Sequence, residues 1–136
     1  MSDLTFSPWV KLFDGAQLQS GLIPDAAEVG VYALAVFLEK VPRGAAHALS
    51  REIIYFGMTQ RQSFKKRMYQ FERAAIKGIK EHAGGITYRQ RYGNAGQNLW
   101  IATYPLEGDC IIETRARLIS DYQRAYNENP KCNLNG

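Results

Sequence analysis

Two tyrosines stand beside glycines in two apolar segments, and an arginine follows the second. Tyr32 ends the tripeptide GVY that starts at Gly30, and Tyr55 begins the tripeptide YFG that ends at Gly57. Arg67 lies a short distance further along the chain. Phenol hydroxyls and a guanidinium can together bind a phosphate and donate hydrogen bonds to it. We therefore ask whether the fold can bring these three groups to one place.

The basic residues are concentrated in one part of the chain. Between positions 61 and 91 there are nine basic and two acidic residues, a net charge of +7, whereas the whole chain carries +4. The remainder must therefore sum to −3. A polyanion such as nucleic acid is the natural partner of such a segment, and a solvated helix face is the alternative. The residues expected to bind nucleic acid are Lys65, Lys66, Arg73, Lys77, Lys80, Arg89 and Arg91.

Length and composition predict one globular domain. The chain has 136 residues, of which 46% are hydrophobic, enough for a single modest core. No apolar stretch approaches the roughly 20 residues of a membrane span, and the first residues, MSDLTFSPWV, lack the pattern of a signal peptide. We expect a cytoplasmic protein without a membrane partner. Cys110 and Cys132 are too few for a disulfide framework, so both are expected to be free thiols.

Three segments have the composition of strands. They are residues 30–38, 52–56 and 99–104. The first two form a hairpin with a long connection, and the third completes a small, mainly antiparallel sheet. In this arrangement Tyr32 and Tyr55 can lie near each other on one side of the sheet. The segment before residue 24 has no clean periodicity and is left without an assigned structure.

The first helix is expected after Ser63, a suitable N-cap. Its apolar residues recur every three or four positions and predict a helix of about 17 residues with one buried face. Arg67 lies on the flank of that face and should reach the side of the sheet that carries the tyrosines. The residues of the apolar face are Phe64, Met68, Phe71, Ala75 and Ile79.

A second helix is expected to begin at the N-cap Asp109 and to run toward Asn127. Glu113 flanks its inner face. Residues 82–98, rich in glycine and asparagine, indicate a mobile loop. The fold class is therefore α/β (α+β), a three-stranded sheet flanked by helices. The inward-facing residues of the second helix are expected to be Ile112, Ala116, Ile119 and Tyr126.

Together these residues resemble the GIY-YIG nuclease superfamily. GVY and YFG correspond to the two motifs that name the superfamily, and the helix arginine, an acidic residue and a late asparagine follow in the family order as Arg67, Glu113 and Asn133. The resemblance runs from Gly30 to Asn133, about three quarters of the chain. It implies a nuclease-like domain over residues 30–136, with residues 1–29 as an N-terminal extension packed on it.

The resemblance implies a metal-dependent endonuclease that hydrolyses phosphodiester bonds of DNA, with RNA not excluded, acting as a monomer or homodimer. Glu113 would hold Mg²⁺ or Mn²⁺, since magnesium takes only one or two carboxylates and keeps several waters. Tyr55 or Tyr32 would accept a proton, provided that neighbouring cations lower its pKa from about 10. Arg67 would stabilise the charge that develops at phosphorus, and Asn133 would donate a positioning hydrogen bond.

The sequence also departs from the family pattern. Met58 stands where many members have lysine, and Phe71 stands where some have a histidine, so that an assisting histidine would have to come from elsewhere, such as His82. Asp121 is the alternative metal ligand because its interval to Asn133 is the more usual one. Two other functions remain open: a catalytically inactive nuclease-like module that binds nucleic acid, and an unrelated interaction domain.

Overall fold

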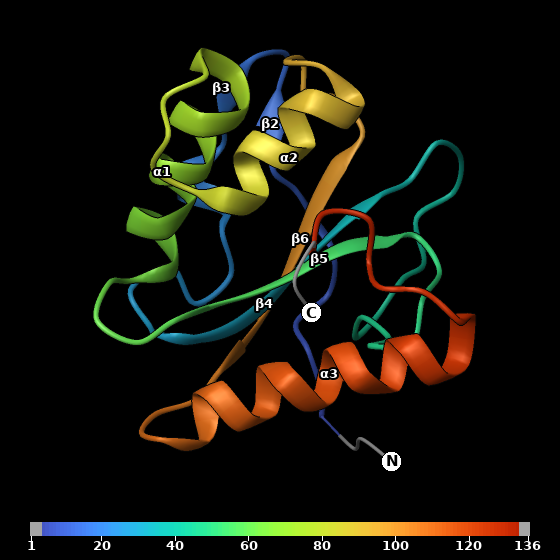
Figure 1. The fold of residues 1–136 in the computed structure, drawn as a ribbon. Coiled ribbons are helices and arrows are strands. Elements are labelled where there is room, and N and C mark those ends of the chain that lie inside the picture. The colour runs from blue at the N-terminus through green and yellow to red at the C-terminus, as the bar shows by residue number, and fades with distance from the viewer. Residues whose placement is uncertain (1–3, 134–136) are drawn as a thin grey trace.

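The computed structural model describes residues 4–133 and shows a mixed α+β fold. A sheet lies between two layers of helices, with α1 and α2 on one face and α3 on the other (Figure 1). The elements are β1 (Val10–Lys11), β2 (Phe13–Asp14), β3 (Gln17–Leu18), the 3₁₀ turn η1 (Ser20–Leu22), β4 (Gly30–Val36), β5 (Ile53–Thr59), α1 (Phe64–Lys77), α2 (Ala83–Tyr92), β6 (Leu99–Pro105) and α3 (Cys110–Tyr126).

The main sheet is antiparallel throughout and has the strand order β1-β6-β4-β5. The expected pairing of β4 with β5 is confirmed, with Tyr32 opposite Gly57. The expectation of three strands is wrong, because β1 pairs with β6 and adds a fourth. β2 and β3 form a separate two-stranded ribbon. Strands of two residues are too short to produce a readable alternation of apolar and polar positions, so no pattern in the sequence indicates them.

Both faces of the sheet are buried, which explains the nearly continuous apolar run in β4. Side chains alternate between the faces along a strand. Tyr32 and Leu34 belong to the core under α1 and α2, whereas Val31 and Ala33 belong to the core under α3. Tyr55 joins the first of these cores. The two tyrosines therefore lie on the same side of the sheet.

Helix α1 begins as expected, because the Ser63 hydroxyl accepts a hydrogen bond from the Lys66 N–H at 3.1 Å. It ends earlier than expected, at Lys77, because Gly78 takes a left-handed conformation with φ of 75°. Ile79 consequently lies outside the helix and is 37% exposed. The predicted apolar face is otherwise buried.

The expectation of a mobile loop over residues 82–98 is wrong, because residues 83–92 form α2. The glycines there do not make a turn. A Cβ on Gly84 would lie 2.6 Å from the Tyr55 ring, and one on Gly85 would lie 2.7 Å from the Ala74 Cβ. The absence of side chains at these two positions allows α2 to lie directly against the sheet and α1, and it also removes the apolar periodicity that would have revealed a helix.

Helix α3 covers the second face of the sheet with a different set of residues from the one expected. Ile119 is buried as predicted, but Ile112 is 52% exposed and Ala116 is also exposed, so these two assignments are wrong. Tyr126 is half-buried. The inner face consists instead of Ile111, Leu118, Ile119 and Tyr122.

The last described residues run along β5, the edge strand of the sheet. The Cys132 N–H donates to the Ile54 carbonyl at 2.7 Å. The Asn133 side chain then pairs with both backbone groups of Phe56: Oδ1 accepts from the N–H at 2.8 Å, and Nδ2 donates to the carbonyl at 3.0 Å. This segment satisfies edge groups that would otherwise be unpaired.

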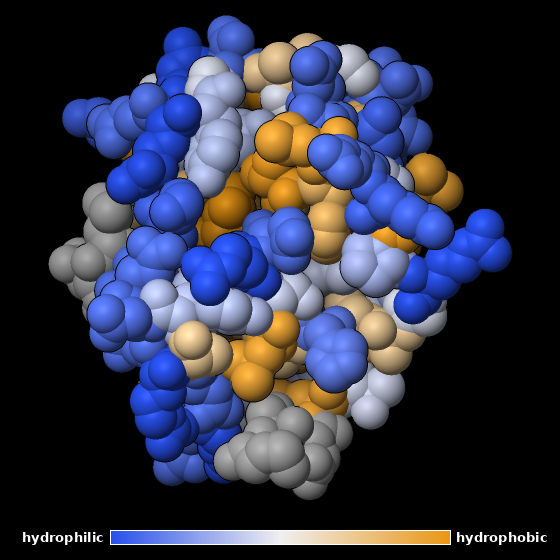
Figure 2. Space-filling model, turned by 90° about the vertical axis from the view of Figure 1, so that its right-hand side faces the viewer, coloured by the Kyte–Doolittle hydropathy of each residue, from blue (hydrophilic) through white to orange (hydrophobic). Residues whose placement is uncertain are grey.

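The connection between β4 and β5, residues 37–52, lies on the side of the molecule that Figure 2 faces, where apolar surface is exposed between hydrophilic side chains. Leu38 and Leu49 in this connection are 78% and 47% exposed. Cys110 is exposed and Cys132 is buried, and both are free, as expected. Within residues 4–133, no helix combines the length and the apolar character needed to cross a membrane.

Candidate functional site

Tyr32 and Tyr55 lie side by side under the two helices, with their ring centroids 6.1 Å apart. Tyr32 is fully buried, and its hydroxyl oxygen lies 2.8 Å from Nε2 of His82. The Tyr55 ring centroid is 5.5 Å from the His82 ring centroid. The structure therefore brings both predicted tyrosines to one cluster and adds a histidine from the start of α2.

Gly57 makes this cluster possible. Because Gly57 pairs with Tyr32 across the two strands, a side chain at position 57 would occupy the space that the tyrosines fill. A Cβ there would lie 2.6 Å from Cε2 of Tyr55 and closer still to Cζ and Oη of Tyr32. Gly30 has a different reason to be glycine, since its φ of 148° is rare for other residues and its Cβ would meet the Tyr104 carbonyl oxygen.

The hydrogen bonds of His82 fix the position of its proton. His82 is the N-cap of α2, and its Nδ1 accepts a hydrogen bond from the Gly85 N–H at 3.1 Å. Burial lowers the pKa of His82 to about 3, and the positive charges of Arg67 and Arg115 act in the same direction. The imidazole is therefore neutral, its one proton is on Nε2, and it donates to the Tyr32 hydroxyl.

Tyr32 does not have the acidity that a proton acceptor would need. Burial raises its pKa well above the ordinary value, and Tyr55 raises it further. Arg67 and Arg115 oppose this change but do not reverse it. Burial therefore outweighs the expected effect of the neighbouring cations at Tyr32. The Tyr32 oxygen accepts from His82 and the whole residue is buried, so its hydroxyl orders the cluster and is not exposed to a ligand.

Arg67 lies on α1 with its side chain half-buried, on the same side of the sheet as the tyrosines. Its Nη1 donates to Oε1 of Gln70 at 2.6 Å and to the Glu81 carbonyl at 3.4 Å. It also lines a small cavity of about 270 Å³ together with residues 58–62. Oε1 of Gln62, from the same segment, is buried without a hydrogen-bond partner among the described residues.

Arg115 is a member of the site that the sequence did not identify. Its Nε donates to the Phe56 carbonyl at 2.9 Å, and its charge acts on both Tyr32 and His82. The spacing in the sequence could have indicated it, because Arg115 lies one helical turn after Ile111, which is buried, and therefore on the same side of the helix. The expected inner face of this helix was rotated away from the observed one, and the sequence analysis gave Arg115 no role.

Glu113 does not lie with these groups. It is exposed, and two residues along a helix correspond to a rotation of about 200°, so it lies on the side of α3 opposite to Arg115. The expectation that it flanks the inner face is wrong.

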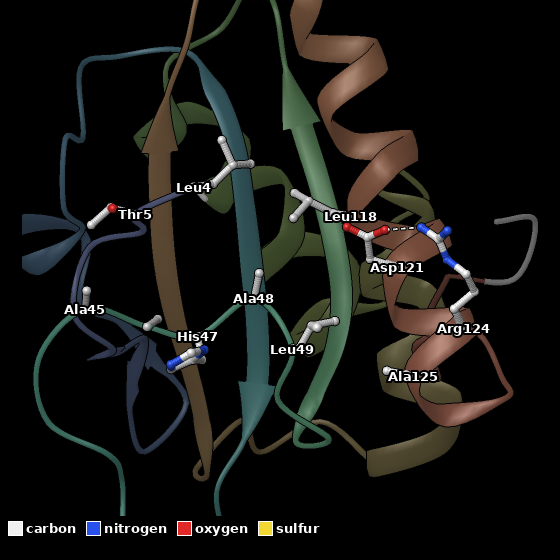
Figure 3. Close-up of a pocket in the computed structure, with 11 residues that line it drawn as sticks. Leu4, Thr5, Ala45, His47, Ala48, Leu49, Leu118, Asp121, Arg124 and Ala125 are labelled. Atoms are coloured by element: carbon white, nitrogen blue, oxygen red, sulfur yellow. Dashed lines mark hydrogen bonds and ion pairs between the residues drawn. The ribbon is translucent and has the colours of Figure 1, made fainter. Parts of the chain in front are cut away.

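Asp121, the alternative metal ligand, lies at another place. It pairs with Arg124 beside a groove of about 730 Å³ between α3 and residues 45–49 (Figure 3). The groove is lined largely by apolar side chains, among them Ala48, Leu49 and Leu118. Asp121 therefore belongs to the groove and not to the tyrosine cluster.

The residues of the tyrosine cluster do not fit the divalent metal ion that the sequence resemblance implies. The groups that face Tyr32 are two guanidinium groups, a second phenol and a neutral imidazole whose Nδ1 is already occupied. Magnesium and manganese prefer oxygen ligands, carboxylates above all. Within residues 4–133, no three side chains of histidine, cysteine, aspartate or glutamate gather in a way that could hold a metal.

Asn133 is also used differently from the expectation. Both polar atoms of its side chain pair with the backbone of Phe56, and the residue is buried. The Phe56 carbonyl accepts from Asn133 and from Arg115. Asn133 therefore fixes the edge of β5 to which Arg115 is attached.

The predicted nucleic-acid-binding residues fall into three groups. Arg73 is exposed but forms an ion pair with Glu81 at 2.8 Å. Arg89 is half-buried and its Nη1 donates to the Ala75 and Ile76 carbonyls at 3.3 and 2.7 Å, which satisfies the C-terminal end of α1. The remaining five, Lys65, Lys66, Lys77, Lys80 and Arg91, are exposed.

In comparisons with known proteins, no family model, no curated protein sequence and no solved structure matches the chain. The chemistry of the site must therefore be inferred from its geometry. Arg67 and Arg115 provide donors and positive charge around the buried tyrosines, and the carboxylate of the nearby Glu81 is paired with Arg73. Such an arrangement can bind an anion, and a phosphate group matches guanidinium donors particularly well.

The packing at Gly57 predicts that Gly57→Ala is destabilising. The added methyl group has no space between the two tyrosine rings, and overpacking of this kind costs about 1–3 kcal/mol of the free energy of unfolding. Gly21→Ala is the matched control, because a Cβ at Gly21 would meet nothing within 4 Å. Urea unfolding of both variants measures the difference, and equal stability would contradict the described packing.

The burial of His82 predicts a loss of stability in acid. The folded pKa of about 3 lies below the ordinary value of 6.5, so between these pH values the unfolded chain binds the proton and the folded one does not. As the pH is lowered through this window, the free energy of unfolding should fall by about 1.4 kcal/mol for each pH unit.

His82→Asn removes this titration and keeps an N-cap acceptor. Urea unfolding at about pH 7 and about pH 4 should show a smaller loss for the variant than for the wild type. If the variant and the wild type lose the same free energy of unfolding between these two pH values, His82 is protonated in the folded protein.

Proposed function

We propose that this protein binds nucleic acid, with DNA as its ligand, and that it holds a backbone phosphate at Arg67, beside the buried tyrosine cluster. The observation that carries the proposal is that the charges of Arg67 and Arg115 both act on Tyr32, while Glu113 lies on the opposite side of α3 from Arg115 and the Glu81 carboxylate is paired with Arg73. Guanidinium groups that form no ion pair with a carboxylate of the described residues can bind an anion.

The charge distribution supports a polyanion rather than a small anion. Four exposed lysines, Lys65, Lys66, Lys77 and Lys80, lie on α1 or directly after it, the same helix that carries Arg67. Lys66 and Lys77, each about a quarter turn from Arg67 around α1, can reach neighbouring phosphates of a strand bound at Arg67, whereas Lys65 lies about 200° away. Contacts of this kind supply affinity and orientation but no sequence preference.

The resemblance to the GIY-YIG superfamily agrees with this proposal in its motifs and differs in its carboxylate. GVY and YFG lie on two paired antiparallel strands and meet at Tyr32 and Gly57, and the arginine of the next helix lies on the same side of the sheet as Tyr32. We therefore propose a nuclease-like domain whose site serves binding.

Binding to DNA should depend on Arg67 and on salt. Arg67→Ala should weaken binding of a labelled duplex by about tenfold or more, since a hydrogen bond to a charged group contributes about 1.5–3 kcal/mol. Arg117→Ala, an exposed arginine on α3, is the control for charge alone. Fluorescence anisotropy across a potassium chloride series gives the affinities.

In the same series, the double variant Lys65→Ala/Lys66→Ala should lower the slope of log affinity against log salt by about 0.9 for each phosphate that these lysines neutralise. An unlabelled RNA of the same sequence, used as competitor, tests whether RNA is bound as well. A wild-type protein that shows no salt-sensitive binding to either nucleic acid would contradict the proposed function.

The second candidate function is the metal-dependent endonuclease activity that the motifs predict. The hydrogen-bonded pair of Tyr32 and His82 favours it, because buried pairs of this kind occur in catalytic sites. If the site serves binding, supercoiled plasmid should remain intact with Mg²⁺, with Mn²⁺ and with EDTA. Nicking that requires the metal and disappears in Glu113→Gln, but not in Asp121→Asn, would establish the hydrolytic function instead.

A further inference from the structure

The site has a second cationic side that comes from α3. The backbone connects the groups: Arg115 donates to the Phe56 carbonyl, the next residue is Gly57, and the Tyr32 hydroxyl lies over Gly57. Arg67 approaches Tyr32 from α1, on the tyrosine side of the sheet. Arg115 therefore lies at the edge of β5 beside Gly57 and Arg67 lies on the tyrosine side of the sheet, so the two guanidinium groups approach the same end of β5 from different helices.

Arg115 is held in place before any ligand binds. The Phe56 carbonyl that accepts its Nε–H also accepts from Asn133, and both bonds are close to 3 Å in length. Among the described residues, the two Nη groups of Arg115 make no hydrogen bond, so their four N–H donors remain available. A fixed guanidinium loses less conformational entropy on binding than a mobile one.

The charge around Tyr32 opposes a divalent cation. Tyr32 and His82 are both neutral, so Arg67 and Arg115 give this place a charge of about +2 before any ligand binds. Glu81, whose carbonyl accepts from Arg67, directs its carboxylate to Arg73 at 2.8 Å, while Glu113 lies on the outer side of α3 and Asp121 at the apolar groove. A phosphodiester carries a single negative charge and finds two guanidinium groups as partners.

We infer that Arg115 takes the place of a divalent metal ion at this site, so that a DNA phosphate is clamped between Arg67 and Arg115 and binds without metal. The inference rests on the proposed function and deepens it, because it assigns the phosphate-binding residues. The contribution of α3 to the site then comes from Arg115, whereas the sequence had predicted that it comes from Glu113 through a bound metal ion.

The test measures binding of a labelled DNA duplex by fluorescence anisotropy in EDTA and in Mg²⁺ at equal ionic strength. The wild type should bind with the same affinity, within about twofold, in both buffers. Arg115→Ala should bind about tenfold or more weakly in both. Arg117→Ala, two residues further along the same helix and exposed, should stay within about twofold of the wild type.

Arg115→Gln separates the charge from the structural hydrogen bond. Glutamine can still donate to the Phe56 carbonyl, so this variant should keep the thermal stability of the wild type while binding DNA as weakly as Arg115→Ala. Wild-type affinity in Arg115→Gln would overturn the inference, and so would a requirement for Mg²⁺ in the wild type.

Failure of the inference can be distinguished from failure of the proposed function. If Arg67→Ala weakens binding and the Arg115 variants do not, the protein binds nucleic acid but Arg115 has no part in it. If the wild type does not bind the duplex in either buffer, the proposed function itself is wrong and the inference falls with it.

Arg115→Glu supplies the converse test. It places a carboxylate on the inner side of α3, near the edge of β5 where Arg115 is bonded to the Phe56 carbonyl, and carboxylate oxygens are the ligands that Mg²⁺ prefers. Its binding in EDTA should be at least as weak as that of Arg115→Ala and should recover in Mg²⁺, whereas Arg115→Ala should not respond. An equal response of the two variants to Mg²⁺ would overturn the assignment of this position.

Discussion

The absence of a side chain at Gly57 is the constraint on which the rest of the site depends. Tyr32 can lie over β5 only because its cross-strand partner has no Cβ, and Tyr55 fills the remaining space. The second ring in turn requires Gly84 on α2. The start of this helix is thereby placed where His82 can reach the Tyr32 hydroxyl. Two glycines far apart in the sequence thus decide where a phenol and an imidazole meet.

Burial then determines what these groups can do. In the interior the charged forms of both residues are disfavoured, so the tyrosine keeps its proton and the histidine does not gain one. A neutral pair of this kind neither attracts a cation nor supplies a strong base. What it offers is a buried hydrogen-bonded pair that fixes the start of α2 against the sheet. The positive charge comes from the helices on either side, through Arg67 and Arg115, and the site as a whole favours an anion.

The sequence was most informative where a pattern extended over many residues. It predicted the β4–β5 pairing, β6, the start of α1 and the meeting of Tyr32 with Tyr55, because long apolar strands and a regular helix face carry their own period. It failed for α2, whose glycines serve close packing, and for β1, which has two residues. The sequence named His82 only as an example of an assisting histidine, and it did not identify Arg115, because the place of a single histidine or arginine depends on how these elements pack.

The rotation of α3 about its axis has the largest functional consequence. Its burial is set by Ile111, Leu118 and Tyr122, which together fix which side chains reach the sheet. Position 115 shares that inner side, and position 113 does not. A difference of two residues in the same helix therefore decides whether a carboxylate or a guanidinium reaches the edge of β5 at Phe56. Since the apolar residues, and not the charged ones, hold the helix at this angle, the character of the site follows from how the core packs. A motif read from residue order alone contains no information about that angle.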